Sequence, residues 1–178
     1  HIFCQGTMPA VDAASGKLLL ASKGSLALSP DGHGGMVSAL NRTGLLDDMQ
    51  QRGIRHLFYM QVDNPLVAVA DPEFLGHHLN SNSEISTQVV RKTDPAEKVG
   101  NVVTVDDRLQ IIEYSDLPEE AAGRRDDSGE LELWAGNIAV HAIEVEFLQH
   151  AAEHLETLPW HFALKTVQHV DAAGKEVK

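Results

Sequence analysis

The chain has 178 residues, of which 26 are acidic and 14 basic, so its formal net charge is −12. Because phosphate groups must be neutralised by cations, this acidic chain without a lysine and arginine cluster is not expected to bind nucleic acid or anionic membranes. Its single cysteine, Cys4, cannot form an internal disulfide, and no apolar run approaches the roughly 20 residues of a membrane span, so we expect one cytoplasmic domain.

The first third of the chain contains a glycine-rich turn between a short strand and a helix. We expect the strand at Ser25–Leu28, the turn at "SPDGHGG" and the helix over Met36–Gln51, where apolar residues follow a helical spacing. Glycines supply positive φ angles, which is sufficient reason for a plain turn. They would also let a flat ligand approach the backbone at Gly32 and Gly34, with a side-chain contact from His33, but the pattern is not that of a phosphate-binding P-loop.

Strands and helices alternate along the rest of the chain. The β-branched and aromatic run over 54–63 predicts a buried strand that ends at Asp63, and Asp71 before Pro72 predicts a helix start. The remaining predicted elements are a strand at 85–92, a hairpin over 99–114 turning at Asp106 and Asp107, a short helix at 115–125, a turn at 126–130, an irregular strand or strand pair at 131–143, a helix at 144–156, a strand at 161–171 and a turn or frayed end at 172–178.

This alternation predicts an α/β fold with a mixed, mainly parallel sheet and flanking helices. Ligands bind such sheets beyond the carboxyl ends of the strands, where Asp63, Glu113 and the glycine turn are expected. A carboxylate at Asp63 suits Mg²⁺, and Glu113 could accept hydrogen bonds from sugar hydroxyls. The plainer alternatives are an Asx-turn at Asp63 and a solvated strand end at Glu113.

Two further patterns concern polar side chains in the second half of the chain. Asn137, after Gly136 in an apolar frame, carries an amide that can donate and accept at once, as a sugar hydroxyl or acetamido group requires, although a β-bulge is the plainer interpretation. The 10 histidines do not favour a zinc site, because they lack the H-E-x-x-H frame and cysteine partners.

Six stretches, taken in order, resemble one family over about Phe3 to Asp171. They read "FCQGTMPAVD", "LSPDGHGGMVSAL", "DMQQRGIRHLFYMQVDNPLVAVADPEFLG", "VVRKTDPAEKVGNVV", "QIIEYSDL" and "AGNIAVHAI". They are similar to the eukaryotic-type UDP-sugar pyrophosphorylases, above all to the UDP-N-acetylglucosamine (UDP-N-acetylhexosamine) group. The order and spacing of the six make the resemblance far more specific than any one motif.

The resemblance implies a Rossmann-like nucleotide-diphospho-sugar transferase fold and a nucleotidyltransferase activity. UTP and an N-acetylhexosamine 1-phosphate would give UDP-N-acetylhexosamine and pyrophosphate, with Mg²⁺ as cofactor. The implied site residues are Gln5 and Gly32 at uracil, His33 in place of the usual ligand-contacting asparagine, Asp63 as catalytic residue near the metal and ribose, Asn64 beside it, Gly100 lining the sugar pocket, Glu113 and Asn137 at the hexose hydroxyls, and Lys165, which remains of a lysine pair.

The family's N-terminal glycine-rich loop and its C-terminal lysine segment have no counterpart in these residues. We therefore expect 1–178 to be the central part of a single nucleotidyltransferase catalytic domain, incomplete in its sheet and inactive alone. Open sheet edges would favour a homo-oligomer or a strand swap. The alternatives are a UTP–glucose-1-phosphate uridylyltransferase, a non-catalytic module that binds sugar nucleotides, and a fragment completed by a partner chain.

Overall fold

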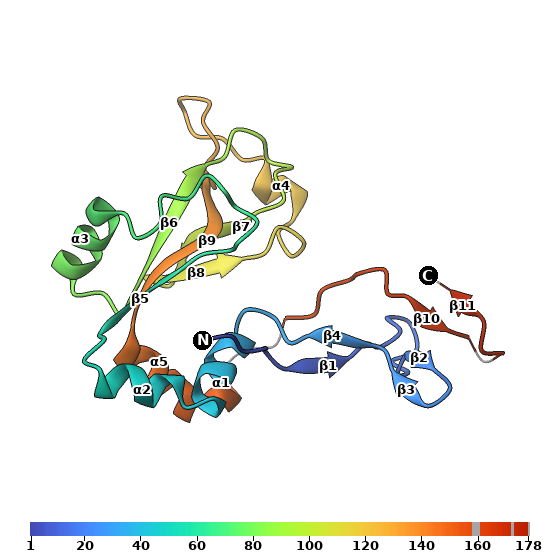
Figure 1. The fold of residues 1–178 in the computed structure, drawn as a ribbon. Helices are drawn as coiled ribbons and strands as arrows, with labels where there is room; N and C mark the ends of the chain where they lie inside the picture. The colour runs from blue at the N-terminus through green and yellow to red at the C-terminus, as the bar shows by residue number, and fades with distance from the viewer. Residues whose placement is uncertain (158–160, 172, 178) are drawn as a thin grey trace. The chain divides into compact units, whose positions relative to one another are not determined.

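The computed structural model describes residues 1–157, 161–171 and 173–177, and the chain divides into two compact units (Figure 1). Unit 1 comprises His1–Gly53 and Leu148–Lys178, and unit 2 comprises Ile54–Phe147. Unit 1 is therefore formed by two segments from opposite ends of the chain. No helix in the described parts of the chain is long and apolar enough to cross a membrane.

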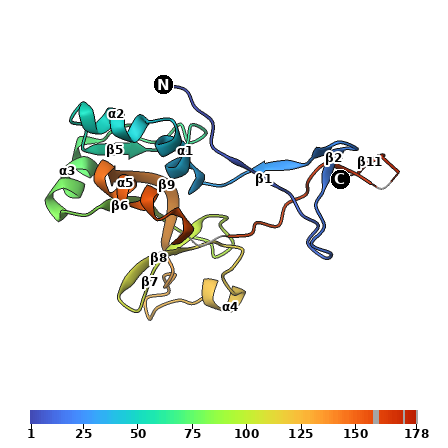
Figure 2. The ribbon, with the colours of Figure 1, turned by 90° about the horizontal axis from the view of Figure 1, so that it is seen from below.

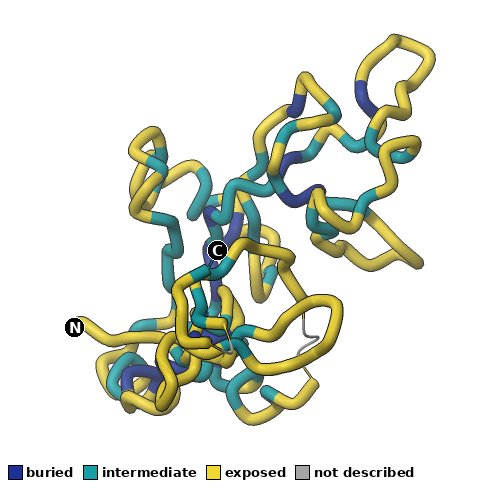
Figure 3. The backbone as a smooth tube through the Cα atoms, turned by 90° about the vertical axis from the view of Figure 1, so that its right-hand side faces the viewer, coloured by how far each residue is buried: buried dark blue, intermediate teal, exposed yellow. Residues whose placement is uncertain are grey.

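Unit 1 contains two small antiparallel sheets of short strands. The strands are β1 (Thr7–Pro9) with β4 (Leu28–Pro30), and β11 (Glu176–Val177), β10 (His169–Val170), β2 (Leu20–Ser22) and β3 (Ser25–Leu26) in that spatial order. Most of their residues are exposed, as Figure 3 shows along the backbone. Strands this short and exposed bury little apolar surface, so they add little to the core.

The core of unit 1 lies among its helices. They are α1 (Gly35–Arg42), α2 (Leu45–Gln51), the end of α5 (Val145–Glu153) from Leu148 onward, and the 3-10 turn η1 (Leu155–Thr157). Leu40, Leu46 and Leu148 are among the buried apolar side chains. The single helix expected over Met36–Gln51 is divided, because the chain turns at Gly44, whose φ of +70° is a left-handed conformation that glycine adopts readily.

Unit 2 is built on a five-stranded sheet with β9 at its centre (Figure 1, Figure 2). Its elements are β5 (His56–Tyr59), α3 (Pro72–Ser81), β6 (Ile85–Arg91), β7 (Gly100–Val105), β8 (Arg108–Ile112), α4 (Glu119–Ala122) and β9 (Ala135–Glu144). Ile143 of β9 pairs with Leu57 on one side and with Ile85 on the other. Further along β9, Gly136 pairs with both Val90 of β6 and Asn101 of β7, so three strands meet there.

The expectation of a mainly parallel sheet is wrong, because every strand pairing between described residues is antiparallel. The physical reason lies in β9. Strands β5 and β6 are joined through helix α3 and run in the same direction, as a strand–helix–strand pattern predicts. However, β9 lies between them and runs the opposite way, so the two similarly directed strands are not hydrogen-bonded neighbours.

Two local predictions are confirmed in unit 2. Asp71 caps α3, because its Oδ1 accepts a hydrogen bond from the amide of Glu73 at 3.4 Å. The β7–β8 hairpin turns at Asp106 and Asp107, whose φ angles of 49° and 59° are those of a type I′ turn.

Two predicted strands are shorter than expected. The strand over 54–63 ends at Tyr59, so three residues separate it from Asp63. The strand over 161–171 is reduced to His169–Val170, and the preceding described residues, Lys165 included, have no regular secondary structure.

Candidate functional site

Three of the predicted site residues meet in the sheet of unit 2. Gly100 begins β7 and pairs with Asn137 of β9, while Glu113 directly follows β8. A Cβ atom on Gly100 would lie 2.9 Å from Ile111 Cγ2, 3.6 Å from Glu113 Oε1 and 3.7 Å from Asn137 Cβ. We call Gly100, Glu113 and Asn137 the β7–β9 cluster. The glycine leaves the space beside the Glu113 carboxylate and the Asn137 Cβ atom open, which is what a ligand with hydroxyl groups would need.

The orientation of the Asn137 amide is fixed by a β-bulge. The β6–β9 register shifts between Gln88 and Val89, and Ala139 on the bulged side has a φ of +54°. There the amide of Ala139 donates a hydrogen bond to Asn137 Oδ1 at 3.0 Å. Because a backbone N–H requires an acceptor, the oxygen must face Ala139, and the NH₂ group remains for a ligand. The bulge and the binding role are therefore compatible, with Asn137 as a donor.

Asp63 and Asn64 lie in the loop that follows β5. Asn64 forms an Asx-turn, because its Oδ1 accepts from the amide of Leu66 at 3.3 Å. The turn predicted as the alternative for Asp63 is thus made by its neighbour. Asp63 is exposed, and the structure records no hydrogen bond or ion pair between its carboxylate and any other residue that it describes. Its carboxylate oxygens are therefore available to a cation.

The second group of predicted residues lies in unit 1, at the glycine turn. Gln5 Nε2 donates to Asp31 Oδ1 at 3.0 Å and to the carbonyl of Gly32 at 3.0 Å. We call Gln5, Asp31 and Gly32 the Gln5 cluster. Since both contacts need a donor, the amide is oriented with its Oε1 directed away from them as an acceptor. Gly32 has a φ of +80°, the left-handed conformation expected for this turn.

Asp31 was not identified from the sequence as part of a site. Its carboxylate occupies the space that a Cβ atom would take on Gly6 or on Gly35, and its amide donates to the carbonyl of Gly6 at 3.2 Å. The two glycines therefore allow the carboxylate to lie close against the backbone. The sequence signal for this residue is its position directly before Gly32, the first glycine of the turn.

The two remaining predicted residues are both exposed in unit 1. The carbonyl of His33 accepts from the amide of Met36 at 3.1 Å, so this residue helps to begin α1. Lys165 lies in the irregular stretch before β10. The structure places neither in the β7–β9 cluster.

A buried polar pair beside the β7–β9 cluster was also missed. Lys92 and Asn101 are 2% and 0% exposed, and Lys92 Nζ donates to Asn101 Oδ1 at 2.6 Å. Lysine is seldom fully buried, and no pattern in the sequence distinguishes this one from a surface lysine. Asn101 adjoins Gly100 in β7, so the pair directly adjoins the cluster.

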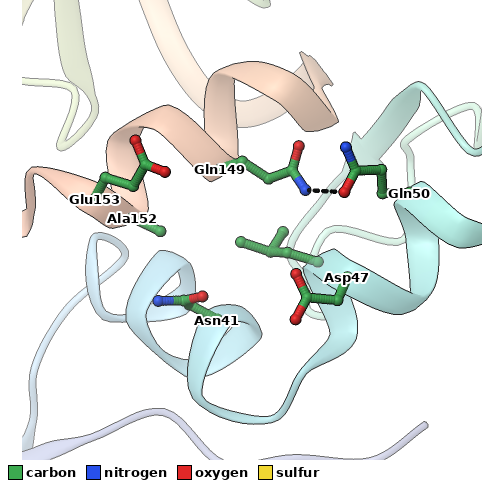
Figure 4. A pocket seen from close by; sticks show the side chains of 7 residues that line it. Asn41, Asp47, Gln50, Gln149, Ala152 and Glu153 are labelled. Carbon is green, nitrogen blue, oxygen red and sulfur yellow. Dashed lines mark hydrogen bonds between the residues drawn. The ribbon is translucent and has the colours of Figure 1, made fainter.

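Unit 1 also has a surface hollow between α1, α2 and α5 (Figure 4). Gln149 Nε2 donates to Gln50 Oε1 at 3.3 Å across it, and Asp47 and Glu153 contribute carboxylates to its lining. None of the predicted site residues lines this hollow. Its polar and acidic walls do not suit a nucleotide, whose phosphates need cations or amide donors.

One group of potential metal ligands occurs among the described residues, at the end of α5. His150, Glu153 and His154 each offer a ligand atom, and these atoms lie within 4.8 Å of one another. All three side chains are exposed, and the two imidazole rings pack edge to face at 4.9 Å. Such a solvated helix face is common without a metal, so we assign it no role.

The chain is similar to known proteins of one family. The profile of the UTP–glucose-1-phosphate uridylyltransferase family matches residues 1–177. The chain is 41% identical to UDP-N-acetylhexosamine pyrophosphorylase-like protein 1 of Xenopus tropicalis, over 99% of the chain and 35% of that protein. It is 38% identical to UDP-N-acetylglucosamine pyrophosphorylase of Saccharomyces cerevisiae, over 99% of the chain and 37% of that protein.

A solved structure is similar as well. It is a crystal structure from Entamoeba histolytica, assigned as a UDP-N-acetylglucosamine pyrophosphorylase, with a TM-score of 0.84 and 35% identity over 99% of this chain and 43% of that one. The chain thus spans about a third of the length of the two curated relatives. The mixed α/β architecture of the chain is therefore shared with an experimentally solved protein of this kind.

Proposed function

The chain belongs to the UTP–glucose-1-phosphate uridylyltransferase family, and from that premise we propose that the complete protein is a uridylyltransferase that makes nucleotide sugars. UTP and an N-acetylhexosamine 1-phosphate would be its substrates, and UDP-N-acetylhexosamine and pyrophosphate its products. The names of the frog and yeast relatives support the N-acetylhexosamine. The proposal extends to a Rossmann-like catalytic domain in the cytoplasm, of which residues 1–178 form the central part.

The single observation that carries this proposal is the β7–β9 cluster. A hexose presents hydroxyl groups that donate and accept hydrogen bonds, and an N-acetyl group adds a carbonyl acceptor. The Glu113 carboxylate, when ionised, can only accept hydrogen bonds. The amide oxygen of Asn137 accepts from the amide of Ala139, so its NH₂ group faces the ligand, and that group can only donate. With Gly100 leaving room between them, the cluster offers both kinds of partner to one ring.

The Gln5 cluster supplies the complementary argument for the base. Uracil carries an N3–H donor, whereas cytosine presents a lone pair at the same position. Gln5 Oε1 is an acceptor once its NH₂ group is held by Asp31 and Gly32, so it suits the uracil N3–H. A donor at that position would instead favour cytosine. The orientation of one amide thus supports UTP as the nucleotide.

Asp63 fits the proposed Mg²⁺, because its exposed carboxylate offers hard oxygen ligands in a loop beside unit 2's sheet. Mg²⁺ commonly takes one or two carboxylates together with water and phosphate oxygens, so one aspartate is enough from this part of the chain. When bound, the ion would offset negative charge on the transferring phosphoryl group.

The reaction needs positioning more than covalent help from the protein. An oxygen of the sugar 1-phosphate attacks the α-phosphorus of UTP and forms the new P–O bond. The bond from that phosphorus to the oxygen bridging to the β-phosphate breaks, and pyrophosphate leaves with the electron pair. The attacking phosphate is already anionic near neutral pH, so the β7–β9 cluster needs only to hold the sugar with this oxygen in line.

The direct test is pyrophosphate release by the complete protein with UTP and each of two sugars, N-acetylglucosamine 1-phosphate and glucose 1-phosphate. We expect Mg²⁺-dependent release with the N-acetylated sugar as the better substrate. Preference for glucose 1-phosphate would overturn the sugar assignment. Absence of release with either sugar, in protein shown to be folded, would overturn the activity itself.

A further inference from the structure

We propose that Lys92 is a positioning residue that, through Asn101, fixes strands β7 and β9 at the level of the β7–β9 cluster. The inference rests on the proposed function, because it takes that cluster as the hexose site. Lys92 itself would touch no substrate and would act by positioning the residues of the β7–β9 cluster.

The first observation is the course of the Lys92 side chain. Lys92 directly follows β6, and its amide donates to the carbonyl of Trp134 at 2.8 Å, just before β9 begins. Its Nζ reaches Asn101 in β7. Because β9 lies between β6 and β7 at this level, the side chain crosses the central strand and connects three strands.

The second observation is that β9 has a glycine where the lysine crosses. A Cβ atom on Gly136 would lie 3.2 Å from Lys92 Cγ and 3.0 Å from Val99 Cγ2, which is tighter than ordinary contact. Gly136 is the Cα partner of Asn101 and immediately precedes Asn137. The lysine therefore passes one residue away from the amide that we assign to the sugar.

The third observation is how completely the pair is buried. Asn101 also donates from Nδ2 to the carbonyl of Ile112 at 3.4 Å, which links β7 to the end of β8 beside Glu113. Burying an ammonium group is unfavourable unless it is hydrogen-bonded and near opposite charge. An apolar side chain could fill the same space without that penalty. What the lysine adds is a directed bond that sets the position of one strand relative to its neighbours.

A weaker, electrostatic interaction joins Lys92 to the loop that leads into β7. Glu97 Oε1 accepts from the amides of Thr93 and Asp94 at 2.8 and 3.0 Å. These backbone hydrogen bonds lower the pKa of the Glu97 carboxyl, and the Lys92 charge adds to the shift. The lysine therefore also interacts with the loop whose last residue precedes Gly100.

The test uses steady-state kinetics of the complete protein with Lys92→Met, which keeps the apolar stem and removes the charge and its bond. We expect the KM for the sugar 1-phosphate to rise about tenfold or more, because small displacements of binding groups have large effects on reactivity. The KM for UTP should change by less than about twofold, since the Gln5 cluster is in the other unit.

Two further variants separate positioning from plain stability. Lys92→Met with Asn101→Leu removes both members of the pair, so the buried Asn101 amide no longer lacks the ammonium donor, and the melting temperature should recover relative to Lys92→Met. The defect in sugar KM should persist in this double variant. Ser86→Ala is the matched control, because it removes the partner of another buried polar side chain, His78, at the opposite end of β6. It should lower the melting temperature and leave both KM values unchanged.

The outcomes are distinct. Equal changes in both KM values for Lys92→Met, or recovery of the sugar KM together with the melting temperature in the double variant, would overturn the inference. A rise in the KM for the sugar 1-phosphate alone, which persists in the double variant although its melting temperature recovers, would support the inference. If the wild-type protein turns over neither hexose 1-phosphate, the proposed function fails before any variant is measured, and the inference fails with it.

Discussion

The two clusters of predicted site residues are held in different ways. In unit 2, Gly100 and Asn137 are fixed by strand pairing around a buried lysine, so their separation is set by backbone hydrogen bonds. In unit 1, Gln5 is exposed and is held by two side-chain hydrogen bonds to a glycine turn. Strand register therefore determines the geometry of the β7–β9 cluster, whereas a few exposed polar contacts determine that of the Gln5 cluster.

The largest expected effect comes from a residue that neither cluster contains. Asp63→Ala in the complete protein should lower Mg²⁺-dependent turnover by about a thousandfold, since the loss of a metal ligand removes several kcal/mol of charge stabilisation. Because Asp63 is exposed, the melting temperature should not change. Pyrophosphate release against Mg²⁺ concentration measures this, with Asp127→Ala, another exposed aspartate, as control. Near-normal turnover in Asp63→Ala would exclude the metal role.

The next prediction tests the rigidity of the β7–β9 cluster. Gly100→Ala places a methyl group 2.9 Å from Ile111 Cγ2 and in the space between Glu113 and Asn137. We expect kcat/KM for the sugar 1-phosphate to fall about a hundredfold, because the strands cannot separate without breaking their pairing. Gly76→Ala, at a helical glycine with open space around it, is the control. A fall of less than about threefold would mean that the cluster is adaptable.

A smaller effect is expected at the Gln5 cluster. Gln5→Glu replaces the NH₂ donor by a carboxylate oxygen beside Asp31, so two hydrogen bonds are lost and two like charges approach. The KM for UTP should rise about tenfold, with the KM for the sugar unchanged. The preference for UTP over CTP should narrow as well. Equal turnover of the two nucleotides by the wild-type protein would contradict the assigned amide orientation.

The smallest effect concerns pH and the core of unit 2. Burial lowers the pKa of His78, and the neighbouring His56 lowers it further, although Glu144 opposes the shift. The folded state therefore favours neutral His78, and below about pH 6.5 the unfolded chain takes up a proton that the folded chain does not. Stability from this group is present above that pH and is lost as the pH falls.

Thermal unfolding at several pH values measures this contribution. Between about pH 7 and pH 5 the melting temperature of the wild type should fall about 2–4 °C more than that of His78→Gln, which keeps a polar partner for Ser86 without titrating. Parallel pH profiles for the two proteins would show that another group is responsible.

Local sequence patterns predicted the elements of the chain better than their arrangement. The Asp71 cap and the turn at Asp106 and Asp107 depend on neighbouring residues, so they could be identified directly. The insertion of β9 between β5 and β6 depends on pairing across more than fifty residues, which no local pattern contains. This is why the predicted parallel sheet was wrong although the helix between the two strands was right.

The same distinction applies to the site. The resemblance of ordered motifs identified Gly100, Glu113 and Asn137, and the structure places them together. It did not identify Lys92 or Asp31, because their importance depends on burial and on close approach to glycine backbone. The roles of the predicted residues remain predictions that kinetics must test.

In the proposed function, the Gln5 cluster recognises the base and the β7–β9 cluster recognises the sugar. Calorimetric titration of UDP and of UDP-N-acetylglucosamine into the complete protein and into Gly100→Ala tests it most directly. We expect the substitution to weaken binding of UDP-N-acetylglucosamine and to leave the affinity for UDP unchanged. An equal loss of affinity for both ligands would contradict it, because the β7–β9 cluster would then act on the nucleotide as much as on the sugar.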